Sequence, residues 1–203
     1  MGRAARYTEQ AVLDAALELV VEGGVAAATG VAIAQRLGAP SGSIYYRFSS
    51  HEKLMATLWI RTIRRFQQGF LEALAGPEPR AAAAGAIRHT LQWAADHPGE
   101  AQLLTQYRRA DLLARWPEVL GDDLAGLNTE VQASVHRFTI AFFGEATPSA
   151  LGRARFALIE IPYAAVRQRI LADGPPRGTP LPRWLIDSVL AASSATLDFS
   201  PRS

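Results

Sequence analysis

Catalytic and metal chemistry usually depends on histidine, cysteine, acidic or serine side chains in recognisable spacings. The four histidines of this chain are His51, His89, His97 and His136. None of them begins a His-Glu-x-x-His motif, cysteine is absent, and neither a phosphate-cradling glycine loop nor a Gly-x-Ser-x-Gly turn occurs. Asp96-His97 is an adjacent acid–base pair, but it stands before Pro98, where ending a helix explains it. We therefore expect no enzyme, no metal site and no cofactor.

A different pattern lies between residues 29 and 54. Ala34 is small enough for two helices to cross closely, and Gly38, four residues later, can supply the positive φ of a tight interhelical turn. Ile44, six residues further, can anchor the second helix against the first. This is the spacing of a helix-turn-helix unit, which presents the start of its second helix to the DNA major groove. Purely structural helix pairs share the spacing, so both interpretations stay open at this point.

The stretch GSIYYRFSSHEKL, residues 42–54, resembles the signature of TetR-family repressors. In that family an Ile-Ala pair, a glycine turn and a Tyr-x-x-Phe motif lead into a long fourth helix. The likeness is detailed over residues 8–58 and only architectural beyond them. The matching residues are Thr29, Ile33, Ala34, Gly38, Gly42, Ile44, Tyr45, Tyr46, Phe48 and Leu54. The resemblance implies a DNA-binding regulator.

The resemblance also selects the positions expected to contact DNA, and side-chain chemistry suggests their roles. Thr29 opens a helix, where its hydroxyl and the backbone N–H groups can bind a phosphate. Tyr46 can donate its phenolic O–H to the DNA backbone, which positions the protein without reading the sequence. The candidates for reading base edges are Ser41, Gly42, Ser43 and Arg47. Tyr45 and Phe48 are expected to pack the small domain.

Two positions depart from the family pattern. His51 stands where the family often has a lysine, although Lys53 follows two residues later, and Gly30 replaces an apolar residue. An uncharged His51 at neutral pH would lack the charge-assisted phosphate contact of a lysine. An alternative interpretation is therefore a helical dimer that binds small molecules and whose DNA-reading head is weakened.

Helices must position these residues, and the composition favours them. Alanine is abundant and runs of β-branched residues are scarce, so we predict an all-α fold of about nine helices. Residues 1–50 would form a three-helix helix-turn-helix domain, and residues 51–203 a helical ligand-binding and dimerisation domain. The predicted helices span 9–22, 30–37, 41–47, 51–73, 80–96, 99–113, 117–144, 149–172 and 182–199. Thr8, Thr29 and Thr147 are the expected N-caps, and Pro162 should kink its helix.

Charge and hydropathy give weaker indications. The net charge is +2, but residues 1–65 hold eight Lys or Arg against five Asp or Glu, an excess that suits a polyanionic partner and equally an ordinary solvated surface. The N-terminus has no apolar core like that of a signal peptide, and no apolar run approaches about 20 residues. We expect a soluble, cytoplasmic protein.

The C-terminal part is rich in helix-spaced aromatic residues, which can line a cavity or form an ordinary core. The resemblance implies a pocket between the fourth and eighth helices for a small-molecule effector. The candidate pocket residues are Phe66, Phe70, Trp93, Gln106, Phe138 and Phe142. The last two helices are the candidates for a homodimeric four-helix bundle. The candidate interface residues are Phe156, Tyr163, Val166, Leu185, Val189 and Ala192. The expected partners are therefore double-stranded operator DNA, the effector and a second copy of the chain.

Overall fold

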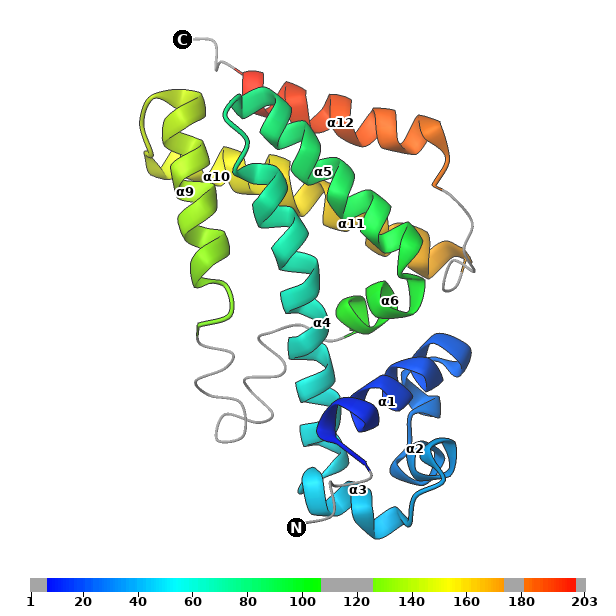
Figure 1. Cartoon of the computed structure of the whole chain (residues 1–203). Helices are drawn as coiled ribbons and strands as arrows, with labels where there is room; N and C mark the ends of the chain where they lie inside the picture. Colours follow the sequence, from blue (N-terminus) through cyan, green and yellow to red (C-terminus); the bar gives the residue numbers. More distant parts are fainter. Residues whose placement is uncertain (1–6, 107–125, 174–180, 200–203) are drawn as a thin grey trace. The chain divides into compact units, whose positions relative to one another are not determined.

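The computed structural model describes residues 7–106, 126–173 and 181–199 (Figure 1). These residues are helical apart from short connections and contain no β-strand, so the predicted all-α fold is confirmed. No helix among them is both long and apolar enough to cross a membrane. They divide into two compact units, and α4 (His51–Leu74) contributes residues to both.

Unit 1 contains, of the described residues, 7–63 and 99–106. Its elements are α1 (Glu9–Gly23), a short 3₁₀ turn η1 (Val25–Ala27), α2 (Gly30–Leu37), α3 (Ser41–Arg47), the beginning of α4, and α6 (Pro98–Gln106), which begins one residue before the second range. The bounds of α2 and α3 agree with the predicted helices. The turn η1 was not predicted.

The ends of α1 and α2 are set by local side-chain chemistry. The Thr8 hydroxyl accepts a hydrogen bond from the Ala11 N–H at 3.1 Å, and the Thr29 hydroxyl accepts one from the Ala32 N–H at 3.2 Å. Each bond satisfies one of the backbone donors that a helix start leaves unpaired. The predicted N-caps at Thr8 and Thr29 are therefore confirmed.

A close approach between α6 and α1 completes unit 1. A Cβ atom added at Gly99 would lie 2.8 Å from the Cα atom of Val21, which is shorter than any ordinary contact. Glycine is therefore required where α6 begins. The start of α6 lies against the last part of α1 at this point.

Unit 2 contains residues 64–98 and the described residues beyond 125. Its elements are the remainder of α4, then α5 (Pro79–Asp96), α9 (Thr129–Phe143), α10 (Pro148–Arg155), a π-helical turn η2 (Phe156–Glu160), α11 (Ile161–Asp173) and α12 (Arg183–Asp198). Thr147 caps α10 by accepting from the Ala150 N–H, with Pro148 at the first helical position as predicted.

The helix predicted over 117–144 begins later than expected, because Gly126 to Asn128 form a turn and α9 starts at Thr129. Residues 117–125 of that prediction lie outside the described residues, as do residues 107–113 of the helix predicted over 99–113. The helix predicted over 149–172 is observed as three consecutive helical segments, α10, η2 and α11, of which η2 is π-helical.

Pro162 explains the π-helical turn. In η2 the Ile161 N–H donates to the Phe156 carbonyl five residues back, and the next N–H in that pattern would belong to residue 162 and reach Ala157. Proline has no N–H to give. The Ser193 hydroxyl of α12 donates to the Ala157 carbonyl instead, at 2.9 Å, in a buried position. A kink was predicted at Pro162; the structure has a π turn just before it, which a side chain from another helix completes.

Ser193→Ala should consequently lower the free energy of unfolding by about 1–3 kcal/mol, because it leaves a buried carbonyl without a donor. Ser194→Ala is the matched control, since Ser194 is exposed on the same helix. Urea unfolding of the two variants measures the difference. Equal midpoints would mean that the Ser193 hydroxyl is not needed to complete the turn.

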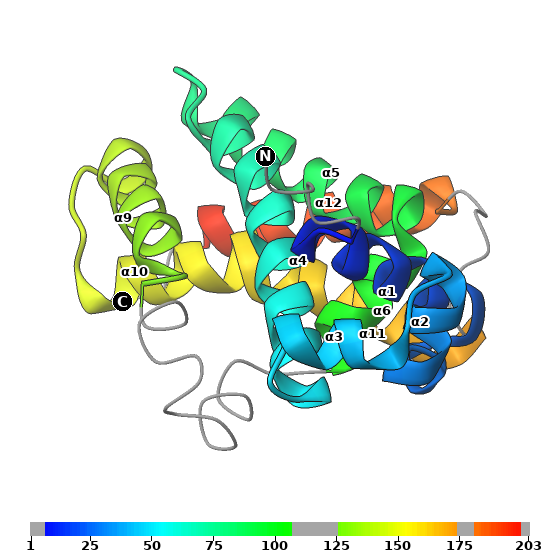
Figure 2. The same cartoon turned by 60° about the horizontal axis from the view of Figure 1, so that its bottom comes forward.

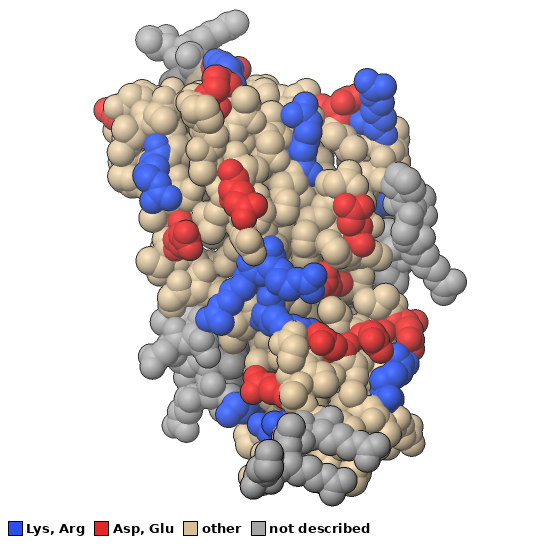
Figure 3. Space-filling view, viewed as in Figure 1, with Lys and Arg blue, Asp and Glu red and all other residues tan. Residues whose placement is uncertain are grey.

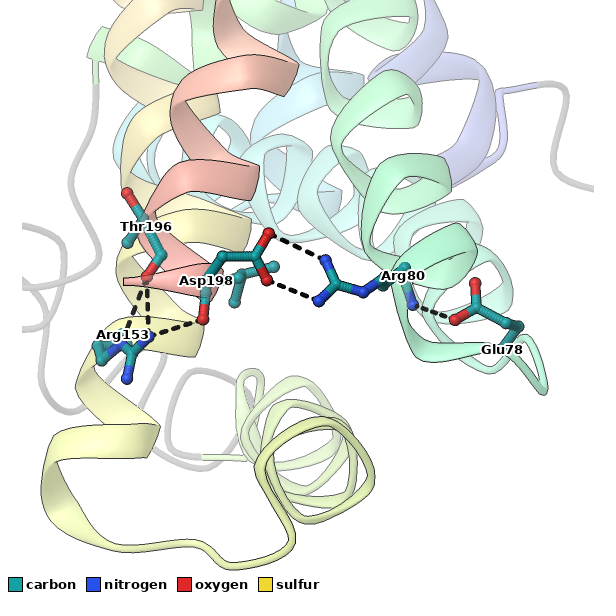
Figure 4. Close-up of polar contacts among 6 residues, drawn as sticks. Glu78, Arg80, Arg153, Thr196 and Asp198 are labelled. Atoms are coloured by element: carbon teal, nitrogen blue, oxygen red, sulfur yellow. Dashed lines mark hydrogen bonds and ion pairs between the residues drawn. The ribbon is translucent and has the colours of Figure 1, made fainter. Parts of the chain in front are cut away.

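Two arginines hold the C-terminal end of α12 (Figure 4). Arg153 donates to the Thr196 and Leu197 carbonyls, two of the acceptors that a helix end leaves unpaired. Arg80, at the start of α5, pairs with both carboxylate oxygens of Asp198, and this guanidinium holds the pKa of Asp198 below its usual value. The end of α12 is thereby joined to α5 and α10.

Candidate nucleic-acid interface

The helix pair α2 and α3 is joined by the predicted glycine turn (Figure 2). Gly38 has φ +61°, in the left-handed region that favours glycine. The Ala39 N–H donates to the Ala34 carbonyl at 2.9 Å, and the Tyr7 hydroxyl donates to the Gly38 carbonyl, also at 2.9 Å. Ala34 and Ile44 are both buried, as the spacing predicts for a close crossing and an apolar anchor.

The outer surface of α3 presents the residues proposed for DNA contact. Tyr46 is 91 % exposed, Gly42 is exposed, and Ser43 and Arg47 are half-buried. A Cβ atom added at Gly42 would meet nothing within 4 Å, so the backbone there is open to close approach by another molecule. Ser41 begins α3, but its side chain lies outside the described residues. On the opposite side Phe48 is buried, as expected for packing of the small domain.

The remaining three predicted contacts lie at the starts of α2 and α4. Thr29 is exposed, and because its oxygen serves as the cap acceptor, its O–H remains able to donate to a phosphate. His51 is half-buried at the first position of α4, with a buried Nδ1 atom that has no hydrogen-bond partner among the described residues. Lys53 is exposed, and its backbone N–H donates a hydrogen bond to the Ser50 hydroxyl oxygen. The candidate cation at this helix start is thus Lys53.

Gly30 has a structural explanation that the sequence reasoning missed. An added Cβ atom at Gly30 would lie 2.7 Å from the Tyr45 hydroxyl oxygen. The Tyr45 side chain, 50 % exposed, therefore occupies the space that an apolar side chain on residue 30 would fill. Gly30 itself is buried. Its departure from the family pattern is compensated within the helix pair.

Ion pairs reduce the number of basic residues available to a polyanion. Arg36 of α2 donates to Glu18 and Glu22 of α1, at 3.1 Å and 2.9 Å, and these bonds raise the pKa of Arg36 and lower that of Glu22. Arg61 is bound to Asp14 at 2.6 Å. Acidic side chains also lie beside basic ones on the face drawn in Figure 3.

Arg47 and Lys53, in contrast, form no ion pair among the described residues. The positive charge free to meet DNA near α3 is therefore local and small. This agrees with the modest charge excess in residues 1–65.

The predicted pocket residues fall into two aromatic clusters of unit 2. Phe66 lies with its ring centre 6.3 Å from that of Phe70 and 5.2 Å from that of Trp93. Phe138 and Phe142 stack at 5.5 Å in the other cluster. The Gln106 side chain lies outside the described residues. No group of three His, Cys, Asp or Glu side chains in the described part of the chain could hold a metal ion.

The predicted dimer residues differ in exposure. Phe156 and Tyr163 are 48 % and 38 % exposed, and Ala192 is exposed on α12. Leu185 is half-buried. The buried Val166 and Val189 pack inside unit 2 itself, because adjoining helices already cover them. An interface with a second copy would therefore depend on Phe156, Tyr163 and Ala192.

Comparisons with known proteins agree with the geometry of α2 and α3. Residues 12–58 match the family model described as "Bacterial regulatory proteins, tetR family". No curated protein sequence matches significantly.

Among solved structures, a transcriptional regulator from Rhodococcus sp. RHA1 is 18 % identical, with a TM-score of 0.68 over 96 % of this chain and 100 % of that one. A TetR transcription regulator from Haloarcula marismortui is 16 % identical, with a TM-score of 0.69 over 94 % of this chain and 96 % of that one. The regulator FadR from Bacillus subtilis, solved with stearoyl-CoA, is 15 % identical, with a TM-score of 0.68 over 94 % and 98 %.

At these identities the structural likeness establishes the fold, while the family match falls on the helix-turn-helix itself. The exposed face of α3, its buried anchors and the glycine turn all lie within the matched residues. The helix-turn-helix region of this chain, residues 12–58, is therefore of the TetR-family type, and the chain has the fold of the transcriptional regulators named above.

Proposed function

We propose that this chain is a ligand-responsive repressor that binds a palindromic operator as a homodimer and is released from it by a small-molecule effector. The observation that carries the proposal is the contrast within α3. Ile44 is buried on this short helix and Phe48 is buried directly after it, while Tyr46 is 91 % exposed on the helix. The exposed Tyr46 is a large aromatic side chain with a hydroxyl, on a helix that Ile44 anchors in the core. Such a side chain is suited to contact another molecule.

The contacts divide into two kinds. Thr29, Tyr46 and Lys53 can each donate to phosphate oxygens, which positions the protein on the duplex. Gly42, Ser43 and Arg47 lie on the helix that would enter the major groove, where Arg can pair with guanine and Ser with either donors or acceptors. His51, half-buried at the first position of α4, is the remaining candidate contact.

Dimerisation is proposed through α11 and α12. One short reading helix per subunit gives a small contact, so two subunits related by a twofold axis are needed for a specific site. Phe156 and Tyr163 leave apolar surface exposed near these helices, and Ala192 is small enough to allow close helix packing. Half-sites would then lie about one helical turn, roughly 34–36 Å, or a multiple of it apart.

An effector is proposed because the family resemblance implies one and because unit 2 is rich in aromatic side chains. FadR from Bacillus subtilis, which shares the fold, was solved with stearoyl-CoA bound. By thermodynamic linkage, an effector that weakens operator binding must bind the operator-bound protein more weakly by the same factor.

Selection of bound DNA from a random pool tests the proposal. Enrichment of a palindrome with two half-sites is expected, and footprinting should protect both halves. An unenriched pool would contradict DNA binding and would instead support a helical ligand-binding dimer with a weakened head. A single protected half-site, together with a monomer in sedimentation, would contradict the dimer.

Tyr46→Phe should weaken binding to all DNA sequences alike, by roughly three- to tenfold, because it removes one hydrogen bond to a phosphate. Ser43→Ala should instead change the preferred base at one or two positions. Tyr46 can be changed without disturbing the core because it lies in solvent, and Ser43 is only half-buried. Competition binding with single-base variants of the selected operator separates the effects. A changed base preference for Tyr46→Phe at undiminished affinity would reverse the assigned roles.

Ala192→Asp should dissociate the dimer. It places a carboxylate in each half of a closely packed interface, where an unpaired buried charge costs at least about 3 kcal/mol, or roughly 100-fold in the dissociation constant. Ala133→Asp on α9 is the matched control, because Ala133 is also an exposed helical alanine. Sedimentation equilibrium measures both. Two variants with the same dissociation constant would place the interface elsewhere.

A further inference from the structure

A groove of about 760 Å³ runs along one side of α5 and meets the first turn of α12 within unit 2. Its lining residues on α5 recur every three or four positions, so they share one face of that helix. The residues that the argument uses are Arg88, His89, Gln92, Trp93, Ile186 and Asp187. A volume of this size lies within the range of small-molecule sites.

Two charged residues that line the groove, Arg88 and Asp96, have no ion-pair partner among the described residues. The carboxylate of Asp96 accepts a hydrogen bond from the Gln92 amide at 2.9 Å. Asp187 lies 3.8 Å from the guanidinium of Arg183, one turn away on α12. Arg88 forms no ion pair with any described residue. A bound molecule with one negative charge would therefore match Arg88 when that charge lies at the Arg88 end of the groove, about two helical turns from Asp96.

The groove also offers flat apolar surface. Trp93 is half-buried, and its ring centre lies 5.3 Å from that of His97. Ile186 of α12 lines the groove as well. Indole and imidazole rings favour stacked or edge contacts with another planar ring. An aromatic body thus suits the groove better than a long, flexible polar one.

Two lining residues also contact α4. His89 has its Nε2 atom 3.0 Å from the Phe66 carbonyl, and since a carbonyl only accepts, Nε2 carries the proton. The Trp93 ring meets the Phe66 ring edge-on at 5.2 Å. Gly69 makes this crossing possible, because an added Cβ atom there would lie 2.8 Å from His89 Nδ1. A molecule that shifts His89 or Trp93 would therefore act directly on α4.

We propose that the groove between α5 and α12 binds a small aromatic carboxylate, with its ring on Trp93 and its carboxylate on Arg88. His89 and Trp93 connect the occupied groove to Phe66 of α4. That the bound molecule acts as the effector rests on the proposed function, whereas binding itself does not.

A phosphate monoester fits less well than a carboxylate. Its second negative charge would find no further unpaired cation among the described lining residues, and it would face Asp96 and Asp187. A guanidinium can hold one carboxylate through two parallel hydrogen bonds, so a single arginine is sufficient to bind it.

Calorimetric titration of the full chain with 2-naphthoate tests the site, with 2-naphthylmethanol as the neutral probe of the same shape. We expect one naphthoate per chain, bound at least about tenfold more tightly than the alcohol. Arg88→Gln should remove that difference, and Arg88→Lys should restore part of it. Arg137→Gln on α9, an exposed arginine away from the groove, is the matched control and should bind like the unchanged chain.

Failure of naphthoate to bind at millimolar concentration would overturn the proposed site. Equal loss of binding in Arg88→Gln and Arg137→Gln would do the same, because the groove would not be the source of the preference. Neither result involves DNA, so operator selection remains an independent test of the proposed function. Binding through Arg88 that leaves the selected DNA bound would support the site and overturn the role of effector.

Discussion

Ile44→Ala is expected to lower the free energy of unfolding by about 2–5 kcal/mol, with loss of DNA binding under conditions where the unchanged chain binds. The side chain is 1 % exposed, and it holds α3 in the helix pair through contacts that the smaller alanine cannot make. Removing three carbon atoms there leaves a cavity as well as lost apolar burial. Since α3 carries Gly42, Ser43 and Arg47, its displacement would also misplace the proposed base-reading residues.

Ile44→Val is the control for this change, because it removes a single methylene and should cost about 0.5–1.5 kcal/mol. Urea unfolding gives the two stabilities, and titration with the selected operator gives the affinities. DNA affinity should fall in the same order as stability. An Ile44→Ala variant with unchanged affinity would show that α3 holds its place without the anchor.

Thr62→Pro is expected to disconnect effector binding from DNA release, and to cost about 3 kcal/mol or more in stability. Thr62 is buried in the middle of α4, where its hydroxyl donates to the Leu58 carbonyl at 2.9 Å. Proline removes the N–H that continues the helix and collides with the preceding turn. At 1.5 Å per residue, α4 extends about 36 Å from His51 to Leu74, so it can transmit a tilt only while it is unbroken.

Thr62→Val keeps the shape of the side chain and the helical N–H while removing the hydroxyl, so it is the matched control. We expect Thr62→Val to release DNA with effector as the unchanged chain does, whereas Thr62→Pro should bind effector yet remain on DNA. Thr62→Gly, which does not remove the N–H, serves if the proline variant fails to fold. Effector affinities measured with and without operator decide the result: in Thr62→Pro they should be equal. If the operator still weakens effector binding to the full extent in both Thr62→Pro and Thr62→Gly, α4 does not connect effector binding to DNA release.

The features that could be predicted from sequence are those produced by interactions a few residues apart. Thr8 and Thr29 cap their helices through N–H groups three residues later, and Gly38 turns the chain between α2 and α3. Because such bonds form within one turn of chain, residue type and spacing suffice to identify them. The same holds for Ile44, whose burial follows from its place on the helix face.

The positions of the proposed DNA contacts were predicted with help from the family resemblance, and their roles stay predictions. Exposure of Tyr46 and burial of Phe48 agree with those roles. The division of the chain at residue 50 is likewise a prediction about function. By compactness alone, the beginning of α4 and most of α6 group with the first three helices.

The sequence by itself determined the helical class, the helix-turn-helix and the caps, because each depends on local hydrogen bonds and on periodic apolar residues. The tertiary structure decided which distant residues meet. It brought the Tyr45 ring over Gly30, Val21 against Gly99, and the Ser193 hydroxyl to the Ala157 carbonyl. It also separated the aromatic residues into two clusters and placed Trp93 in both a cluster and a groove. Spacing along one helix specifies which residues share a face, but the face it meets depends on how the helices pack, and that is a property of the whole fold.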